Sequence, residues 1–87
     1  MSASLTLVYF AWVREKIGRD EEQLPHPGAQ ATINDILGQL EQRGEGYAAA
    51  FSDRSKVRAA LDQHFVPLDT PLGAARELAL FPPVTGG

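Results

Sequence analysis

The sequence predicts an α+β fold in which a mixed sheet packs on one main helix, with a second, short helix after the first strand. Three observations lead to this class. Strand-forming residues stand near both ends of the chain, as LTLVYF and as ELALF. Between them, ATINDILGQLEQRG has the apolar periodicity of an amphipathic helix. The chain has 87 residues, 44% of them hydrophobic, which fits a single compact domain.

The first strand is predicted at residues 5–10, which are almost continuously apolar. Such a run is typical of a central strand that is covered on both faces. The segment AWVREKIG follows, with apolar residues at helical spacing and Gly18 where a left-handed C-terminal cap is expected. We therefore expect a short helix directly after the first strand.

An acidic run, Asp20, Glu21 and Glu22, comes next and allows two interpretations. Three carboxylates together could bind a metal ion, or they could lie on a solvated segment, either an edge strand or a loop. Charge runs are ordinarily solvated, which favours the second interpretation. The following PHPGAQ has the composition of a loop.

The main helix is predicted to begin after Thr32, which can act as the N-cap with Asp35 at the third helical position. Gly44 is positioned to end this helix. The face that should lie on the sheet consists of Ile33, Ile36, Leu37 and Leu40. The segment GYAAAF is expected to add a further, partly helical turn beside it.

Two short strands are predicted in VRAALDQHFV, joined by a turn through Asp62 and Gln63. In the last strand, Leu78 and Leu80 should face one way, and Ala79 and Phe81 the other. This order of elements is that of the β-grasp, or ubiquitin-like, topology. We expect residues 1–81 to form the β-grasp domain and residues 82–87 to form an extended C-terminal tail ending in Gly-Gly.

Composition argues against several classes of function. The formal net charge is −3, so there is no basic field for nucleic acid. The chain has no cysteine, which excludes thiolate metal sites and cysteine nucleophiles. His26 and His64 stand outside any metal-binding motif, so no metal is expected. Ser52, Asp53 and Ser55 have turn chemistry rather than a hydrolase motif.

Neither a targeting segment nor a membrane segment is expected. MSASLTLVYF lacks the basic start of a signal peptide, and no apolar run approaches the roughly 20 residues of a membrane helix. These features favour a cytoplasmic protein that does not associate with a membrane. No internal active site is recognisable, so the tail becomes the main functional candidate.

The tail has features suited to entering the pocket of another protein. Two prolines favour a stiff, extended exit from the fold, and six residues can reach roughly 20 Å. Glycine has no Cβ, so the last two residues can thread a narrow channel. A frayed end or an expression scar remains the alternative. The candidate residues are Pro82, Pro83, Val84, Thr85, Gly86 and Gly87.

The segments LVYFAWVREKIG, TPL and ELALFPPVTGG resemble the molybdopterin synthase small subunit (MoaD) family of β-grasp sulfur carriers. The resemblance implies that an ATP-dependent, E1-like enzyme adenylates the carboxylate of Gly87, and that sulfur then displaces AMP to leave a thiocarboxylate. The tail would next enter the large synthase subunit and donate sulfur to a cyclic pyranopterin monophosphate. The chain would be the sulfur-donating subunit of a two-subunit sulfurtransferase, with no active site and no bound cofactor of its own. ATP would be consumed by the activating enzyme, and the family suggests a heterotetramer with the large subunit.

Apolar surface should provide the docking contacts, because a carrier must bind at least two proteins. Phe81 is the first candidate; Phe10 lies beside it if the first and last strands are neighbours, as in the family, and Phe65 could complete the patch. The alternative is that all three phenylalanines belong to the core. The sequence departs from the family pattern at Asp62, often Asn, and at Ala74, Ala75 and Arg76, where a Gly-Asp-rich turn is usual.

Three other functions share parts of this pattern. One is a protein modifier that forms an isopeptide bond through Gly87 to lysines of target proteins. Another is a sulfur carrier for a different pathway, since thiamine-pathway carriers also end in Gly-Gly. The last is a β-grasp binding module whose tail is inert. The sequence alone names neither the sulfur donor nor the acceptor.

Overall fold

The computed structural model describes residues 3–83, which form one sheet of five strands, three α-helices and a short 3-10 helix. The strands are β1 (Ser4–Tyr9), β2 (Glu21–Pro25), β3 (Arg58–Leu61), β4 (His64–Val66) and β5 (Glu77–Phe81). The helices are α1 (Ala11–Ile17), α2 (Ile33–Glu41), α3 (Glu45–Phe51) and the 3-10 helix η1 (Arg54–Lys56). The predicted α+β class and the β-grasp topology are confirmed.

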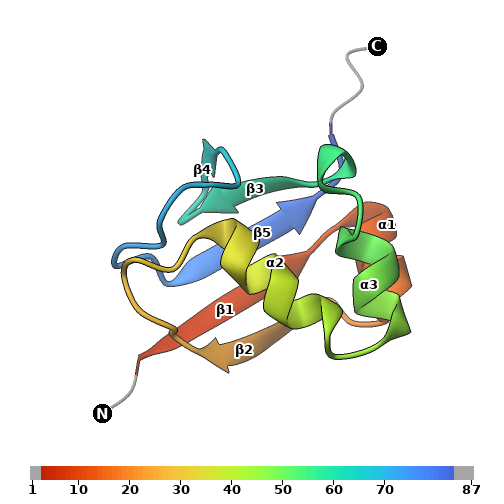
Figure 1. The fold of residues 1–87 in the computed structure, drawn as a ribbon, viewed down its shortest axis with the longest axis horizontal. Helices are drawn as coiled ribbons and strands as arrows, with labels where there is room; N and C mark the ends of the chain where they lie inside the picture. The colour runs from red at the N-terminus through yellow and green to blue at the C-terminus, as the bar shows by residue number, and fades with distance from the viewer. Residues whose placement is uncertain (1–2, 84–87) are drawn as a thin grey trace.

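The strand order is β2-β1-β5-β3-β4 (Figure 1). β1 and β5 are parallel, and the other neighbouring strands are antiparallel. The first and last strands are therefore adjacent, as expected. β1 is an interior strand, but the centre of the sheet is β5.

The core lies between the sheet and α2 and α3, which cross one face, while α1 packs beside α3 (Figure 1). Its largest fully buried side chains are Leu5, Leu7, Tyr9, Ile33, Ile36, Leu37, Leu40, Phe51, Leu78 and Leu80. The expectation that β1 is covered on both faces is wrong, because Thr6 and Val8 are half-buried on the face without helices. A continuous apolar run does not distinguish a strand covered twice from one whose second face carries an uncovered apolar patch.

The predicted helix ends hold in most cases. α1 ends at Gly18, which has φ +89° in the left-handed region. At the start of α2, the Thr32 hydroxyl accepts a hydrogen bond from the Asp35 amide at 3.2 Å, and the Asp35 carboxylate accepts one from the Thr32 amide at 2.9 Å. α2 ends at Glu41, however, and Gly44 is the N-cap of α3. The amides of residues 42 and 43 bond back three residues, which closes α2 with a tight turn earlier than expected.

α3 is a full seven-residue helix rather than a single turn, and it lies very close to α1. A Cβ atom at Gly46 would collide with the backbone carbonyl oxygen of Lys16. Only a residue without a side chain permits this approach. Sequence periodicity gives no signal for such a contact between two helices.

Candidate functional site

The sheet face opposite the helices is open within residues 3–83 (Figure 1). Backbone pairing aligns Val8 with Ala79, Ala79 with Ala60, and Ala60 with Phe65 across four strands. Two small alanines in the middle of this row leave a shallow hollow between larger side chains. The hollow is lined by Val8, Phe10, Ala60, Gln63, Phe65, Glu77, Ala79 and Phe81.

The three phenylalanines chosen from the sequence come together around this hollow. Phe65 is 79% exposed and Phe10 is 49% exposed, and they are the exposed large apolar side chains among the described residues. Phe81 is half-buried, and its ring centroid lies 5.4 Å from that of Phe65. Placement of all three in the core is therefore wrong. Exposed aromatic rings on a hollowed, largely apolar surface are typical of a protein interaction site.

A two-residue turn presents Phe65. Asp62 and Gln63 both adopt positive φ, +48° and +73°, as the favoured turns of short hairpins require. The Asp62 carboxylate also accepts hydrogen bonds from the amides of Arg76 and Glu77, each at 3.0 Å. Asp62 thus anchors the β3–β4 hairpin to the start of β5. The two departures from the family pattern meet at this contact.

Phe10 is positioned by the junction between β1 and α1. Its amide donates a hydrogen bond to the carbonyl oxygen of Leu80 at 3.1 Å, which holds it beside the end of β5. The next residue, Ala11, has φ +54° and turns the chain into the helix. This conformation is unfavourable for alanine by about 1 kcal/mol. The strain lies directly beside the aromatic patch, by which we mean Phe10, Phe65 and Phe81 around the hollow.

The tail begins at this same end of the sheet. β5 ends at Phe81, where the domain is expected to end, and Pro82 and Pro83 follow it half-buried. The other tail candidates, Val84, Thr85, Gly86 and Gly87, lie outside the described residues. The aromatic patch therefore adjoins the point where the tail leaves the sheet.

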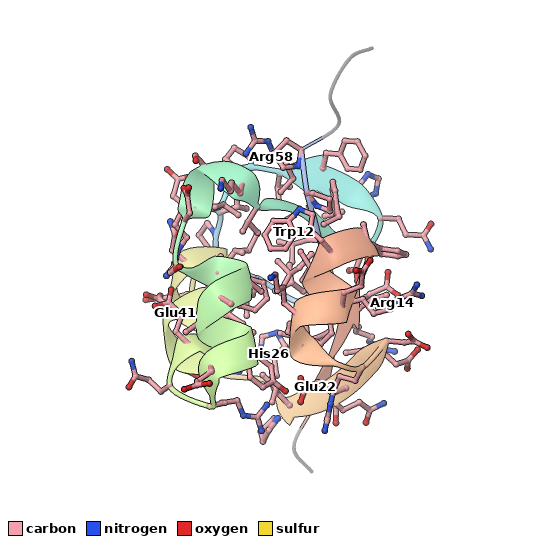
Figure 2. The ribbon with its side chains drawn as sticks, turned by 90° about the vertical axis from the view of Figure 1, so that its right-hand side faces the viewer. Trp12, Arg14, Glu22, His26, Glu41 and Arg58 are labelled. Atoms are coloured by element: carbon pink, nitrogen blue, oxygen red, sulfur yellow. The ribbon has the colours of Figure 1, made fainter. Side chains whose placement is uncertain are left out.

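The acidic run is only partly solvated, which corrects the expectation for one of its members. Glu22 lies on β2 with its side chain only 7% exposed, near the end of the molecule opposite Arg58 (Figure 2). Its carboxylate accepts hydrogen bonds from the hydroxyls of Tyr9 at 2.7 Å and Tyr47 at 2.6 Å, and pairs with Arg43 at 2.9 Å. Alternation along β2 directs this residue towards the helices, a register that the sequence alone did not indicate.

These contacts change the acidity of the cluster. Burial opposes ionisation of Glu22, but the hydrogen bonds from Tyr47 and Tyr9 and the Arg43 guanidinium outweigh it and lower the pKa of the carboxyl. Burial, followed by the hydrogen bond to Glu22, raises the pKa of both tyrosine hydroxyls. A structural role explains the cluster, since every polar atom of the carboxylate has a partner.

No metal-binding group of three or more His, Asp or Glu side chains occurs among residues 3–83. The Nδ1 atom of His26 accepts a hydrogen bond from the Gly28 amide at 3.1 Å, and its buried Nε2 atom has no hydrogen-bond partner within residues 3–83. Asp53 caps η1 by accepting a hydrogen bond from the Ser55 amide, which confirms the predicted turn chemistry. In the described range no helix is both long and apolar enough to cross a bilayer.

Comparison with known proteins decides the family. The ThiS family model matches residues 7–87, a range that includes the aromatic patch and the whole tail. The chain belongs to the ThiS family. Among ThiS-like relatives, the molybdopterin synthase sulfur carrier subunit of Haemophilus influenzae is 37% identical over 83 residues, and that of Escherichia coli is 34% identical over 83 residues. Each alignment covers 95% of this chain and 99% of the relative.

Solved structures share the fold of this ThiS-family chain. The small archaeal modifier SAMP1 of Haloferax volcanii is 26% identical with a TM-score of 0.68, covering 98% of this chain and 100% of that one. A chain from the complex of subunits 1 and 2 of molybdopterin-converting factor from Helicobacter pylori is 21% identical with a TM-score of 0.63. That match covers 97% of this chain and 99% of the other.

Proposed function

We propose that this chain is the sulfur carrier subunit of a molybdopterin synthase. The observation that carries the proposal is the similarity, over nearly the full length of both chains, to two proteins named molybdopterin synthase sulfur carrier subunits. The family match continues through Gly86 and Gly87, the residues on which the chemistry depends. The open aromatic patch beside the tail supplies the docking surface that a carrier needs.

The proposed chemistry takes place at the carboxylate of Gly87. A free carboxylate is a poor electrophile, so an E1-like enzyme first attaches it to the α-phosphate of ATP and releases pyrophosphate. A sulfur nucleophile then displaces AMP and leaves a thiocarboxylate. In the large subunit, the thiocarboxylate sulfur forms a bond to a carbon atom of a cyclic pyranopterin monophosphate, and a carbon–oxygen bond at that carbon breaks so that its oxygen leaves. Water then cleaves the acyl–sulfur bond, which leaves the sulfur on the substrate as a thiolate and restores the carboxylate of Gly87. The carrier supplies the sulfur but holds no cofactor.

Docking on the large subunit and on the activating enzyme is proposed to use the open sheet face. Phe65 and Phe10 would lose their exposed area on binding, and Phe81 would place Pro82 and Pro83 at the rim of the partner's pocket. The structural relative from Helicobacter pylori is a subunit of such a two-subunit complex. We propose the same pairing for this chain, in a heterotetramer of two carriers and two large subunits.

The intact mass of the chain tests the carrier chemistry. After incubation with ATP, an activating enzyme of the family and a sulfur source, we expect a mass gain equal to replacing one oxygen by sulfur, localised to the peptide containing Gly87. The control is the same chain without Gly86 and Gly87, which should fold normally and gain nothing. An unchanged mass, with an activating enzyme that works on another carrier, would refute the proposal.

Binding to the large subunit tests the docking surface. Phe65→Ala should weaken binding by about 2 kcal/mol, roughly thirtyfold, because an exposed aromatic ring that becomes buried is a typical hot spot. The fold should be nearly unaffected, since 79% of Phe65 is already exposed. His64→Ala is the matched control, because His64 is the preceding exposed residue of β4 and points to the other face. Equal affinities for the two variants would argue against this surface.

The second candidate is a protein modifier, favoured by the similarity to the archaeal modifier SAMP1. It needs the same adenylate but ends in an isopeptide bond between Gly87 and a target lysine. Digestion of cell proteins should then leave Gly-Gly remnants on lysines that disappear when the chain is deleted. Absence of such remnants together with a thiocarboxylate favours the carrier.

A further inference from the structure

Two opposite charges stand on the open sheet face: Glu77 lines the hollow, and Arg58 lines the neighbouring pocket, which shares the Phe65 and Phe81 rings with the hollow. Arg58 pairs with Phe81 in the sheet register, at the end of β5 where the tail begins (Figure 2). Glu77 begins β5 and lines the hollow on the side away from the tail. Four residues of strand separate their positions, about 13 Å at 3.3 Å per residue.

Neither charge is neutralised within the described part of the chain. No carboxylate of residues 3–83 lies within 4.0 Å of the Arg58 guanidinium, and no cation of that range lies within 4.0 Å of the Glu77 carboxylate. Arg58 is instead steadied by backbone carbonyls, since its Nη1 donates to Val57 at 3.0 Å and to Ser55 at 3.4 Å. These contacts hold the cation beside η1 without neutralising its charge.

The remaining rim and floor are mostly uncharged. The floor of the hollow consists of Val8, Ala60 and Ala79, and Phe65 and Phe81 form a wall on the side of Arg58 because they also line its pocket. On β2, Glu21 pairs with Val8 and adds negative charge beyond the floor, away from Arg58. The face is therefore apolar in the middle, positive where the tail begins and negative at the far side.

We infer that Arg58 and Glu77 set the orientation in which the large subunit docks on this face. The complementary surface of that subunit carries apolar side chains against the hollow, an acidic group opposite Arg58 and a basic group opposite Glu77. A partner rotated on the face would place like charges together, which costs affinity and slows association. This inference rests on the proposed function, because it names the charge pattern of the same partner. Its consequence is that the tail is delivered in one direction.

Charge reversal tests the inference with the intact chain and the large subunit. Arg58→Glu and Glu77→Arg should each weaken binding about tenfold at low salt, mainly through slower association. The double variant keeps the net charge of −3 but inverts the pattern, so its affinity should fall about a hundredfold if the two effects add. Near 1 M salt, where the screening length is about 3 Å, all differences should shrink to about twofold.

Two controls separate this inference from the proposed function. Lys16→Glu changes the net charge by the same amount as Arg58→Glu. Lys16 lies on α1, beside residues of α3, and away from the open face, so the affinity of this variant for the large subunit should stay within about twofold of that of the unaltered chain. Phe65→Ala tests the docking surface without changing charge.

Normal binding by the double variant would overturn the inference, because net charge rather than its arrangement would then matter. Reversals without effect while Phe65→Ala weakens binding would overturn it too and leave the proposed function intact. Unchanged binding by all variants, including Phe65→Ala, would reject the docking surface and the inference with it.

Discussion

Replacing Glu22 by alanine is expected to lower the free energy of unfolding by about 3 to 4 kcal/mol. The carboxylate is 7% exposed and accepts two tyrosine hydroxyls at 2.7 and 2.6 Å. Hydrogen bonds to a charged group contribute about 1.5 to 3 kcal/mol each, and loss of the acceptor leaves both hydroxyls without a partner. The Arg43 pair adds less than about 1 kcal/mol, because the Arg43 side chain is 44% exposed and its charge is screened by solvent. Glu22→Gln keeps one acceptor oxygen and should cost about half as much.

Urea unfolding at pH 7 measures this loss, and thermal unfolding should show a fall in Tm of roughly 15 to 25 °C for Glu22→Ala. Glu21→Gln is the matched control, since Glu21 is the exposed neighbour on the same strand and should change stability by less than about 0.5 kcal/mol. In Glu22→Gln, an added Tyr47→Phe change should cost less than it does alone, because the two residues share a hydrogen bond. Equal stability of the Glu22→Ala and Glu21→Gln variants would refute the assignment of Glu22 as a buried anchor.

The other predictions concern packing, the hairpin anchor and pH. Gly46→Ala should destabilise the fold by about 1 to 2 kcal/mol, because its Cβ meets the Lys16 carbonyl, whereas Gly38→Ala on α2 has open space and should stabilise the fold by up to about 1 kcal/mol. In urea unfolding, the midpoint should therefore fall for Gly46→Ala and rise for Gly38→Ala. Stabilisation by both substitutions would contradict the close approach of α3 to α1. Asp62→Ala should lower the free energy of unfolding by about 2 kcal/mol, because the amides of Arg76 and Glu77 lose their acceptor. Asp62→Asn should lower it much less, since Asn keeps an acceptor oxygen and tolerates positive φ. Equal losses in urea unfolding would argue against Asp62 as the anchor of the hairpin. Folding lowers the pKa of Glu22 below 4.5, so the contribution of Glu22 to the free energy of unfolding is complete above that pH and is lost as pH falls through the folded pKa. Folding raises the pKa of Tyr9 and Tyr47 above 10, so their contribution to the free energy of unfolding is complete below pH 10 and is lost as pH rises above it. The free energy of unfolding, measured over a pH series, should therefore decline at both low and high pH. An equal decline at low pH in the Glu22→Gln variant would exclude ionisation of Glu22 as the cause of the low-pH decline.

Local sequence chemistry predicted most of the elements. Thr32 and Asp35 satisfy each other's backbone amides without help from the rest of the chain, so the start of α2 can be read directly from its residues. Gly18 ends α1 for an equally local reason, its access to positive φ. The end of α2 was predicted wrongly at Gly44. Glycine can end one helix or precede the next, and at Gly44 the choice depends on how α3 packs after it.

The candidate site was predictable in part. Phe81 and Ala79 were assigned to one face by alternation, and the β1–β5 pairing that joins Phe10 to them was expected from the family resemblance. What alternation could not give is which face the helices cover, and therefore whether the phenylalanines are buried or exposed. The same limit applies to Glu22, since the register of β2 places it against the tyrosines.

The sequence by itself determined the order of elements, the C-cap of α1, the N-cap of α2, the Gly-Gly ending and the residues that could contact a partner. These depend on short-range bonding and on residue type, which a linear pattern records. The tertiary structure decided that the open face is apolar between Arg58 and Glu77, that Glu22 is an anchor, and that Gly46 lies against α1. Each of these results from residues distant in the chain being brought together by strand register and helix packing, and no local preference encodes that proximity.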